Sequence, residues 1–352
     1  MLVLPLWVLG TIFAAASAAV WLAGVQLSRT AAVLDKRFGW GSALGGLILL
    51  AVATNLPELA ITVTAAATGN LEIAVGNILG GIALQTVVLV LVDAVGVRGE
   101  RPLTYRAASQ ALIVEAVIVV AALAAVMAGS QMPSGLVIAR LTPDGALIAG
   151  IWVSGLFLVR RAQTGQSWSE LDRQPDAQAN PKARAVRATG VAAGSGTGAS
   201  VVVFATAAAA TLAAGVALEE SGSAIADRTG LSGVLFGATV LALVTSLPEI
   251  STGLAAAREG EYELAVSDIL GGNAFLPVLF PVAVLISGNS VLPQARPADN
   301  YLTALAILLT VIYLLGLLFR PGHRYARLGI DSLAVLVLYV LGMAGLSFVS
   351  TG

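Results

Sequence analysis

The sequence contains no cysteine and a single histidine, His323, among 352 residues. The absence of cysteine excludes disulfides, thiolate metal sites and cysteine nucleophiles. With one histidine in a short polar loop, we expect neither a histidine-based metal site nor a catalytic triad. Charged residues are also scarce, at 11% of the chain, and the net charge of −1 gives no reason to expect a nucleic-acid partner.

Apolar residues make up most of the remainder, with 57% of the chain hydrophobic and a mean hydropathy of +0.90. A soluble protein of this length could not bury that much apolar surface, so the composition predicts an all-α integral membrane protein. A membrane core of about 30 Å requires roughly 20 apolar residues per helix. Ten segments meet this requirement: 4–26, 43–68, 71–93, 107–128, 142–160, 199–218, 231–257, 262–287, 300–319 and 329–349.

The first segment differs from a secretory signal peptide because no lysine or arginine precedes it. Ala16-Ser17-Ala18 has the small residues of a cleavage site, but a signal peptide also requires a basic start. We therefore expect this segment to remain as the first helix.

Lysine and arginine gather in alternate loops between the predicted helices, which sets the orientation in the membrane. One set of loops holds 16 of these residues and the other set holds the remaining 3, which are Arg140, Arg228 and Arg296. Because basic loops stay in the cytoplasm, we expect both termini outside and the 29–42 and 160–198 loops inside. The localisation expected from this pattern is the inner, or cell, membrane.

One stretch of the sequence occurs twice. Residues 53–85 align without a gap with residues 244–276, at an offset of 191, and 15 of 33 positions are identical. The charge pattern places the turn at Gly69 outside and the turn at Gly260 inside, so the copies enter the membrane from opposite faces. A second pair, Arg140-Leu-Thr-Pro-Asp144 and Arg327-Leu-Gly-Ile-Asp331, opens the fifth and tenth helices.

These patterns predict two inverted five-helix repeats, the architecture of many secondary transporters. The first repeat spans 1–161, a polar cytoplasmic linker spans 162–198, and the second repeat spans 199–352. The glycines at 190–198 superficially resemble a phosphate loop, but the lysine and the preceding strand are missing. We therefore expect no nucleotide, no cofactor and no enzymatic reaction, and transport would be driven by an ion gradient.

Each copy of the repeated stretch places a glutamate beside a proline inside an apolar helix, as Pro57-Glu58 and Pro248-Glu249. An ionised carboxylate at that depth costs at least about 2.5 kcal/mol, so it should face a cavity, a cation or another acid. The bland alternative is a protonated glutamate that hydrogen-bonds a neighbouring helix. Proline has no N–H, so the carbonyls of Ala53 and Val244 lose their helical donors.

Further oxygen atoms lie close to each glutamate in the sequence. Thr54 and Thr245 precede the glutamates by four residues and share their helix face, and Asn55 and Ser246 are adjacent. Carboxylates, carbonyls, hydroxyls and amides are the ligands of hard cations such as Ca²⁺. The sequence therefore predicts a hard-cation site within these two helices.

The second helix of each copy adds Asn77 and Asp268 at matching positions. Asp268 is a candidate third acid of the site, and a hydrogen bond to a neighbouring helix is its equally plausible role. Glu115 lies in the fourth segment without a counterpart in the second half, and the sequence gives no account of it.

The paired Thr-(Asn/Ser)-Leu-Pro-Glu motifs, each followed by an Ile-Leu-Gly-Gly helix, resemble the alpha repeats of the calcium/cation antiporter superfamily. More narrowly, they are similar to the sodium/calcium exchanger membrane region, and the resemblance covers the whole chain. It implies that Glu58 and Glu249 bind Ca²⁺, assisted by Thr54, Thr245 and nearby carbonyls. It also implies alternating access, in which the first and sixth helices slide over the other eight.

The chain departs from that family pattern after the second-helix glycine. Where the family has Gly-Ser-Asn and then Asn or Asp, the first copy has Gly80-Gly81-Ile82 and then Gln85, and the second has Gly271-Gly272-Asn273 and then Leu276. Two serine hydroxyls and one carboxylate that help to hold sodium are therefore absent. Asp268 can return one acid, and three mutually repelling acids would favour protons in an empty site.

We therefore expect a secondary-active antiporter that exchanges Ca²⁺ for Na⁺ or H⁺, with inorganic cations and the lipid bilayer as its partners. The alternative is a sodium/proton or other cation/proton exchanger with the same fold. A non-transporting sensor is more remote because no output domain is recognisable. An intramembrane aspartyl protease would also place two acids in two helices, but its Tyr-Asp and Gly-x-Gly-Asp motifs are missing.

Overall fold

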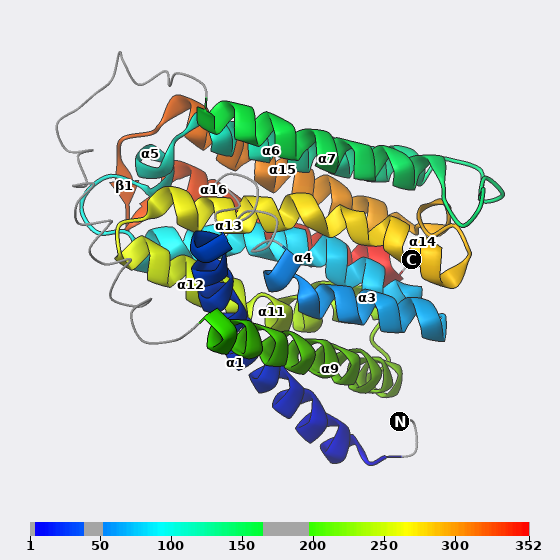
Figure 1. Ribbon diagram of the computed structural model, residues 1–352. Coiled ribbons are helices and arrows are strands. Elements are labelled where there is room, and N and C mark those ends of the chain that lie inside the picture. Colours follow the sequence, from blue (N-terminus) through cyan, green and yellow to red (C-terminus); the bar gives the residue numbers. More distant parts are fainter. Residues whose placement is uncertain (1–3, 39–51, 165–196, 352) are drawn as a thin grey trace.

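A computed structural model describes residues 4–38, 52–164 and 197–351, and these form an almost entirely helical bundle (Figure 1). The elements in chain order are α1 (Leu6–Phe38), α3 (Leu56–Thr68), α4 (Leu71–Leu91), η2 (Val92–Gly96), α5 (Leu103–Ala107), α6 (Gln110–Gly129), α7 (Pro143–Thr164), α9 (Thr197–Thr229), α10 (Gly233–Phe236), η5 (Gly237–Leu241), α11 (Ala242–Thr245), α12 (Leu247–Arg258), α13 (Tyr262–Phe275), η6 (Leu276–Val278), α14 (Leu279–Ser287), η7 (Leu292–Gln294), α15 (Pro297–Phe319), β1 (Arg324–Tyr325), β2 (Leu328–Gly329) and α16 (Ile330–Thr351).

Eight helices of the described residues are long and apolar enough to cross a membrane. A further span consists of two pieces, Gly233–Thr245 and Leu247–Arg258, which meet at an angle of 44°. The predicted span 43–68 begins outside the described residues, and its described part ends as the short apolar helix α3. The prediction of an all-helical, multi-pass membrane protein is confirmed at this level.

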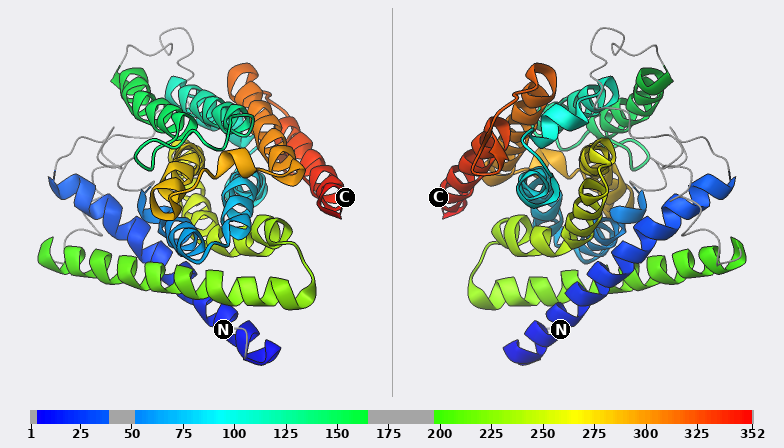
Figure 2. Two further views of the ribbon diagram at one scale, coloured as in Figure 1. Left: turned by 90° about the vertical axis from the view of Figure 1, so that its right-hand side faces the viewer. Right: turned by 90° about the vertical axis from the view of Figure 1, so that its left-hand side faces the viewer.

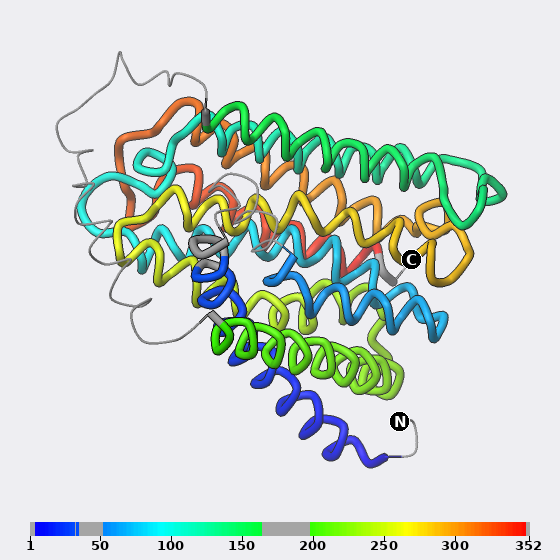
Figure 3. Tube along the Cα trace, in the orientation of Figure 1, coloured from blue at the N-terminus to red at the C-terminus, as the bar shows by residue number. Residues whose placement is uncertain are grey.

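The helices α1 and α9 are much longer than the spans predicted at 4–26 and 199–218, because both contain 33 residues. The prediction ended each span where the apolar run ended, whereas each helix continues through a polar stretch. The two helices pack along each other, and this tertiary contact stabilises helical turns that hydropathy alone would not predict. In Figures 2 and 3, they form a layer that crosses the rest of the bundle at an angle.

The largest apolar core lies among α4, α6, α13 and α15, which pack against one another. Two smaller apolar clusters connect α1 and α9 to the repeated stretches. One contains Ile61 of α3, and the other contains Ala53 just before it. The repeated stretches, which carry the predicted cation site, therefore lie between the main core and the α1–α9 layer.

The two turns within the repeated stretches lie at opposite ends of the bundle (Figure 1). The α3–α4 connection is at the right-hand end of the view, together with both chain termini, and the α12–α13 connection is at the left-hand end. Both turns contain a glycine with positive φ, Gly69 at 80° and Gly260 at 85°, a conformation that glycine adopts without steric cost.

Two tight hairpins precede α7 and α16. Strands β1 and β2 pair Arg324 with Gly329, and an isolated bridge joins Ile138 to Leu141. The two central residues of each turn are an alanine and an arginine with positive φ, at 139–140 and 326–327. The predicted helix starts are confirmed, because α7 begins at Pro143 and α16 at Ile330.

Candidate functional site

The helix breaks just before the proline in each repeated stretch, and the two breaks fall at matching residues. Asn55 (φ −91°, ψ 15°) separates the helical turn at 52–54 from α3, and Ser246 (φ −84°, ψ 0°) separates α11 from α12. Each following helix has its proline at the second position, where the missing N–H is tolerated. The proline therefore places a glutamate in the first turn of a new helix, deep within the bundle.

Glu58 and Glu249 are almost completely buried, with 0% and 1% of their surfaces exposed. No carboxylate oxygen of either side chain has a hydrogen-bond partner among the described residues. The Thr245 hydroxyl faces Glu58 without forming a hydrogen bond of acceptable geometry. Four buried acceptor oxygens without donors are costly in a folded protein unless a ligand satisfies them.

The two repeated stretches contact each other crosswise. Thr245 of the second stretch donates its hydroxyl proton to Asn77 Oδ1 of the first, at 3.4 Å. Asn55 of the first stretch packs on Gly272 of the second, where a Cβ would lie 3.2 Å from Asn55 Nδ2 and 3.6 Å from Gln85 Oε1. Residues that lie far apart in the sequence therefore converge on one buried polar region.

The charged groups of this region are in electrostatic contact. The Glu249 carboxylate interacts with those of Glu58 and Asp268. Asp268 Oδ2 also accepts a short 2.6 Å hydrogen bond from Thr252 Oγ1, and Asp268 Oδ1 has no partner among the described residues. Within that part of the chain, no three acidic or histidine side chains converge on a position where they could hold one ion. The participation of Asp268 in a site with the two glutamates stays a prediction.

The remaining predicted residues supply a shell of neutral oxygens. Thr54, Asn55, Gln85 and Ser246 are all buried. The Ser246 hydroxyl donates to the Ala242 carbonyl at 2.8 Å, and Asn55 Nδ2 donates to Thr54 Oγ1 at 3.4 Å. Ala53 and Val244, whose carbonyls lose a helical donor because of the prolines, lie in the same region. Ala53 is buried and Val244 is half-buried.

Close helix approach makes this convergence possible. A Cβ at Gly76 would meet the Val234 carbonyl oxygen at 2.5 Å, and one at Gly237 would meet the Asn77 nitrogen at 2.9 Å. Only glycine fits between backbones at that separation. The contact holds α4 against α10 and η5, which places Asn77 beside Thr245.

Three polar residues outside the predicted set take part in the region. Asn273 donates to the Ile82 carbonyl at 3.4 Å and to the Thr86 hydroxyl at 3.3 Å, so α13 is bonded to α4. Thr252 is the donor to Asp268. A signal for Asn273 existed, because it is an amide where the first copy has Ile82, whereas Thr86 and Thr252 can be found only from the packing.

Glu115 lies to one side of the two glutamates. It is 3% exposed, and its Oε1 accepts a 2.9 Å hydrogen bond from Ser267 Oγ on α13. Its carboxylate interacts electrostatically with that of the exposed Glu263. The residue therefore packs α6 against α13 and stays outside the glutamate pair.

Comparison with known proteins places the chain among ion exchangers. The family model described as "Sodium/calcium exchanger protein" matches residues 8–159 and 199–347. The inner membrane protein YrbG of Escherichia coli (strain K12) is 26% identical over 300 residues, which cover 82% of each chain. The putative antiporter CaxA of Alkalimonas amylolytica is 27% identical over 276 residues, covering 77% of this chain and 79% of CaxA.

Solved structures share the fold over nearly the whole chain. The H⁺/Ca²⁺ exchanger CAX has a TM-score of 0.69 at 13% identity, with 97% of this chain and 86% of CAX covered. The sodium-calcium exchanger NCX_Mj has a TM-score of 0.61 at 16% identity, with 97% and 99% covered. YfkE has a TM-score of 0.63 at 16% identity, with 96% and 92% covered.

Proposed function

Because the chain belongs to the sodium/calcium exchanger protein family, we propose that it is a secondary-active antiporter that exchanges Ca²⁺ for Na⁺ or H⁺ across the cell membrane. The observation that carries the proposal is the pair of buried glutamates, Glu58 and Glu249. Their four oxygens lack hydrogen-bond partners among the described residues, and the two repeated stretches also bury hydroxyl and amide side chains.

The charge and the donor atoms of this region suit a divalent hard cation. Two carboxylates would balance the charge of one Ca²⁺, so that the loaded site is neutral within the membrane. Ca²⁺ takes six to eight oxygens, which hydroxyls, amides and carbonyls can complete around the two acids. Thr54, Asn55, Thr245 and Asn77 are the side chains closest to this role.

Transport requires that this site opens to one side of the membrane at a time. The breaks at matching residues and the turns at opposite ends of the bundle support an inverted repeat. The proposed ten helices follow from the apolar segments of the sequence, and the proposed external position of both termini follows from its loop charges. The α1–α9 layer lies across both repeated stretches, so its movement would expose the site alternately on each side.

A flux measurement tests the proposal. Purified protein in sealed proteoliposomes should accumulate radioactive Ca²⁺ when an opposing Na⁺ or H⁺ gradient is imposed, and the uptake should stop when the gradient is dissipated. Uptake of other cations, such as Na⁺ against H⁺, is measured in parallel. If no gradient moved Ca²⁺ in a preparation that moved another cation, the ion assignment would be wrong and the exchanger assignment would stand.

A cation/proton exchanger of the same fold is the second candidate. The side chains on α4 and α13 favour coupling to protons over coupling to sodium ions. Gly81 has no side-chain oxygen, and the Asn273 amide is bonded to α4. Binding several Na⁺ ions requires many oxygens to replace the water around each ion. The site therefore has fewer ligands for sodium, while buried carboxylates are able to exchange protons for a cation.

A further inference from the structure

A second charged site lies at the other end of the bundle from the chain termini. An open cavity of about 820 Å³ is formed where the η2–α5 connection meets the α15–α16 connection. Four arginines, one histidine and one glutamate are among its lining residues: Arg98, Arg101, Arg324, Arg327, His323 and Glu100. We propose that this cavity binds a phosphate-class anion, with the headgroup of an anionic membrane phospholipid as its source.

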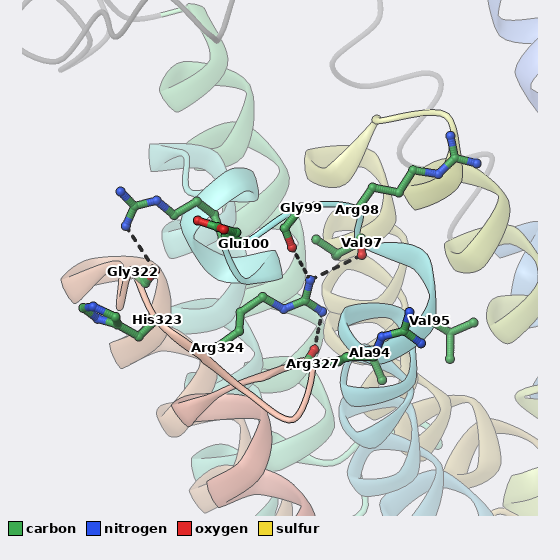
Figure 4. A pocket seen from close by; sticks show the side chains of 11 residues that line it. Ala94, Val95, Val97, Arg98, Gly99, Glu100, Gly322, His323, Arg324 and Arg327 are labelled. Carbon is green, nitrogen blue, oxygen red and sulfur yellow. Dashed lines mark hydrogen bonds between the residues drawn. The ribbon is translucent and has the colours of Figure 1, made fainter.

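Arg324 joins the two connections and shapes the cavity (Figure 4). Its guanidinium donates to the carbonyls of Gly99 at 2.9 Å and Asp93 at 2.6 Å, and also to the carbonyl of Arg327. Asp93 is fully buried and accepts hydrogen bonds from the backbone N–H groups of Leu103 and Gly329. The cavity is therefore built on a fixed frame rather than on separate surface loops.

The cavity contains more arginines than the contacts around Arg324 use. The side chains of Arg98 and Arg327 make no hydrogen bond or ion pair with the described residues, although the Arg327 carbonyl accepts from Arg324, and the Nε donor of Arg324 is buried there without an acceptor. Arg98 extends away from Arg324 in Figure 4, and Arg101, which also lines the cavity, donates to the Gly322 carbonyl at 3.1 Å. Arginine binds phosphate oxygens through two parallel N–H donors, which makes such an anion the natural ligand.

The turn that presents Arg327 is itself unusual. Ala326 and Arg327 have φ values of 49° and 73°, a conformation that residues other than glycine rarely adopt. The matching turn at the opposite end, Ala139-Arg140, has the same conformation, but Val137 stands where the second turn has Arg324. The fold therefore repeats the turn at both ends, whereas the arginine cluster occurs at one end.

The surroundings favour a lipid headgroup over a free anion. Val95 lines the cavity and is 50% exposed, and Tyr325, which follows the lining residue Arg324 in the chain, is 58% exposed. Exposed aromatic side chains at the ends of membrane-spanning helices lie at the level of the lipid headgroups. Arginines at this level attract anionic lipids, whose phosphates they can approach directly.

Lipid binding to the full-length protein tests this proposal. The protein is placed in nanodiscs of phosphatidylcholine with or without phosphatidylglycerol, and the lipids retained after extraction are measured by native mass spectrometry. The test variant is Arg98→Gln/Arg327→Gln, and the matched control is Arg29→Gln/Arg258→Gln, which removes two arginines outside the cavity. Melting in phosphatidylcholine alone shows that each variant is folded.

We expect wild type and the control to retain phosphatidylglycerol in preference to phosphatidylcholine. The cavity variant should lose that preference by at least about tenfold, because each arginine near an anionic surface contributes about 1 kcal/mol. Equal retention by the two double variants would overturn the proposal. A third arm adds inorganic phosphate to protein in pure phosphatidylcholine. If phosphate raises the melting temperature of wild type but not of the cavity variant, while phosphatidylglycerol is not retained, the cavity binds an anion. In that case the assignment of a lipid headgroup as its source is wrong.

Discussion

At the scale of single residues, the two glutamates differ from the buried acids Asp93 and Glu115, whereas Asp331 at the start of α16 also lacks partners for its carboxylate oxygens among the described residues. Asp93 shares its oxygens among backbone N–H groups and Ser332, and Glu115 accepts from Ser267. Glu58 and Glu249 have no such donors within the described residues. Evolution of a merely structural acid would be expected to supply donors, because an unsatisfied buried carboxylate destabilises the fold. The lack of donors at both glutamates, which occupy matching positions of the two repeated stretches, supports the cation site that we propose.

Replacing either acid with its amide separates binding from folding. We expect Glu58→Gln and Glu249→Gln each to reduce Ca²⁺ flux by more than about thirtyfold, since losing a buried charged partner costs about 2 kcal/mol or more. The melting temperature should stay the same or rise, because a neutral amide costs less to bury. Flux in proteoliposomes and melting in detergent measure the two effects, with the exposed Glu100→Gln as a control. Wild-type flux in both variants would show that the cation binds elsewhere.

Asp268 allows the driving ion to be identified. An asparagine cannot exchange a proton, but it keeps an oxygen for the hydrogen bond from Thr252. If protons drive transport, Asp268→Asn should lower uptake driven by a pH gradient severalfold more than uptake driven by a sodium gradient, and Glu263→Gln on the same helix should change neither. A steep, cooperative sodium dependence in wild type, without any response to a pH gradient, would contradict proton coupling.

At the scale of elements, α1 and α9 each contact the proline of one repeated stretch. A Cβ at Gly24 of α1 would lie 2.5 Å from Pro248 Cγ, and one at Gly215 of α9 would lie 2.6 Å from Ala60 Cβ and 3.0 Å from the Pro57 carbonyl oxygen. Gly24 and Gly215 are 191 positions apart, the same offset as the repeated stretches. The two long helices therefore approach the two helix breaks in equivalent ways.

These glycines provide a test of movement. We expect Gly24→Ala and Gly215→Ala to slow Ca²⁺ flux at least about tenfold, because the added methyl wedges the α1–α9 layer away from the breaks, and to cost roughly 1–3 kcal/mol of stability as overpacking. Gly10→Ala and Gly198→Ala are matched controls on the same helices, since a Cβ at either meets nothing within 4 Å. If the two glycines tolerated alanine with wild-type flux, this contact would not limit transport.

The sequence predicted which helices exist better than it predicted where they end. The prolines predicted lost helical donors at Ala53 and Val244, and the helix breaks lie two residues further along, at Asn55 and Ser246. The polar ends of α1 and α9 were missed, because only contact between those helices keeps them helical. The hairpin turn at Ala326-Arg327 was also missed, since neither residue is typical of positive φ and the fold around Arg324 stabilises the turn.

The pairing within the site was beyond the reach of sequence reasoning. Composition and spacing led to the prediction that both glutamates bind a hard cation, since an acid in an apolar helix is informative by itself. They could not show that Thr245 faces Asn77, or that Asp268 is bonded to Thr252. Those contacts depend on how closely Gly76 and Gly237 let the helices approach, which is a property of the packed bundle.

At the scale of the whole molecule, the basic residues and the two turns of the repeated stretches are both distributed between the two ends of the bundle. The α3–α4 connection and both termini lie at one end of the bundle, and the α12–α13 connection lies at the other. The four arginines of the cavity gather at the end away from the termini. Lysine and arginine are retained on the cytoplasmic side of a membrane protein. The arginine-rich end is therefore the end that we expect to face the cytoplasm.

This orientation can be measured directly, because the chain has no cysteine to interfere with labelling. Thr68→Cys and Glu259→Cys place single thiols in the two exposed turns, next to Gly69 and Gly260. In intact cells, a membrane-impermeant maleimide should label the first thiol, and the second should react only after the membrane is opened. Each variant serves as the control for the other, and its flux shows that it is folded. Labelling of both thiols from the same side would contradict the inverted repeat, and with it the alternating access that the two glutamates are proposed to serve.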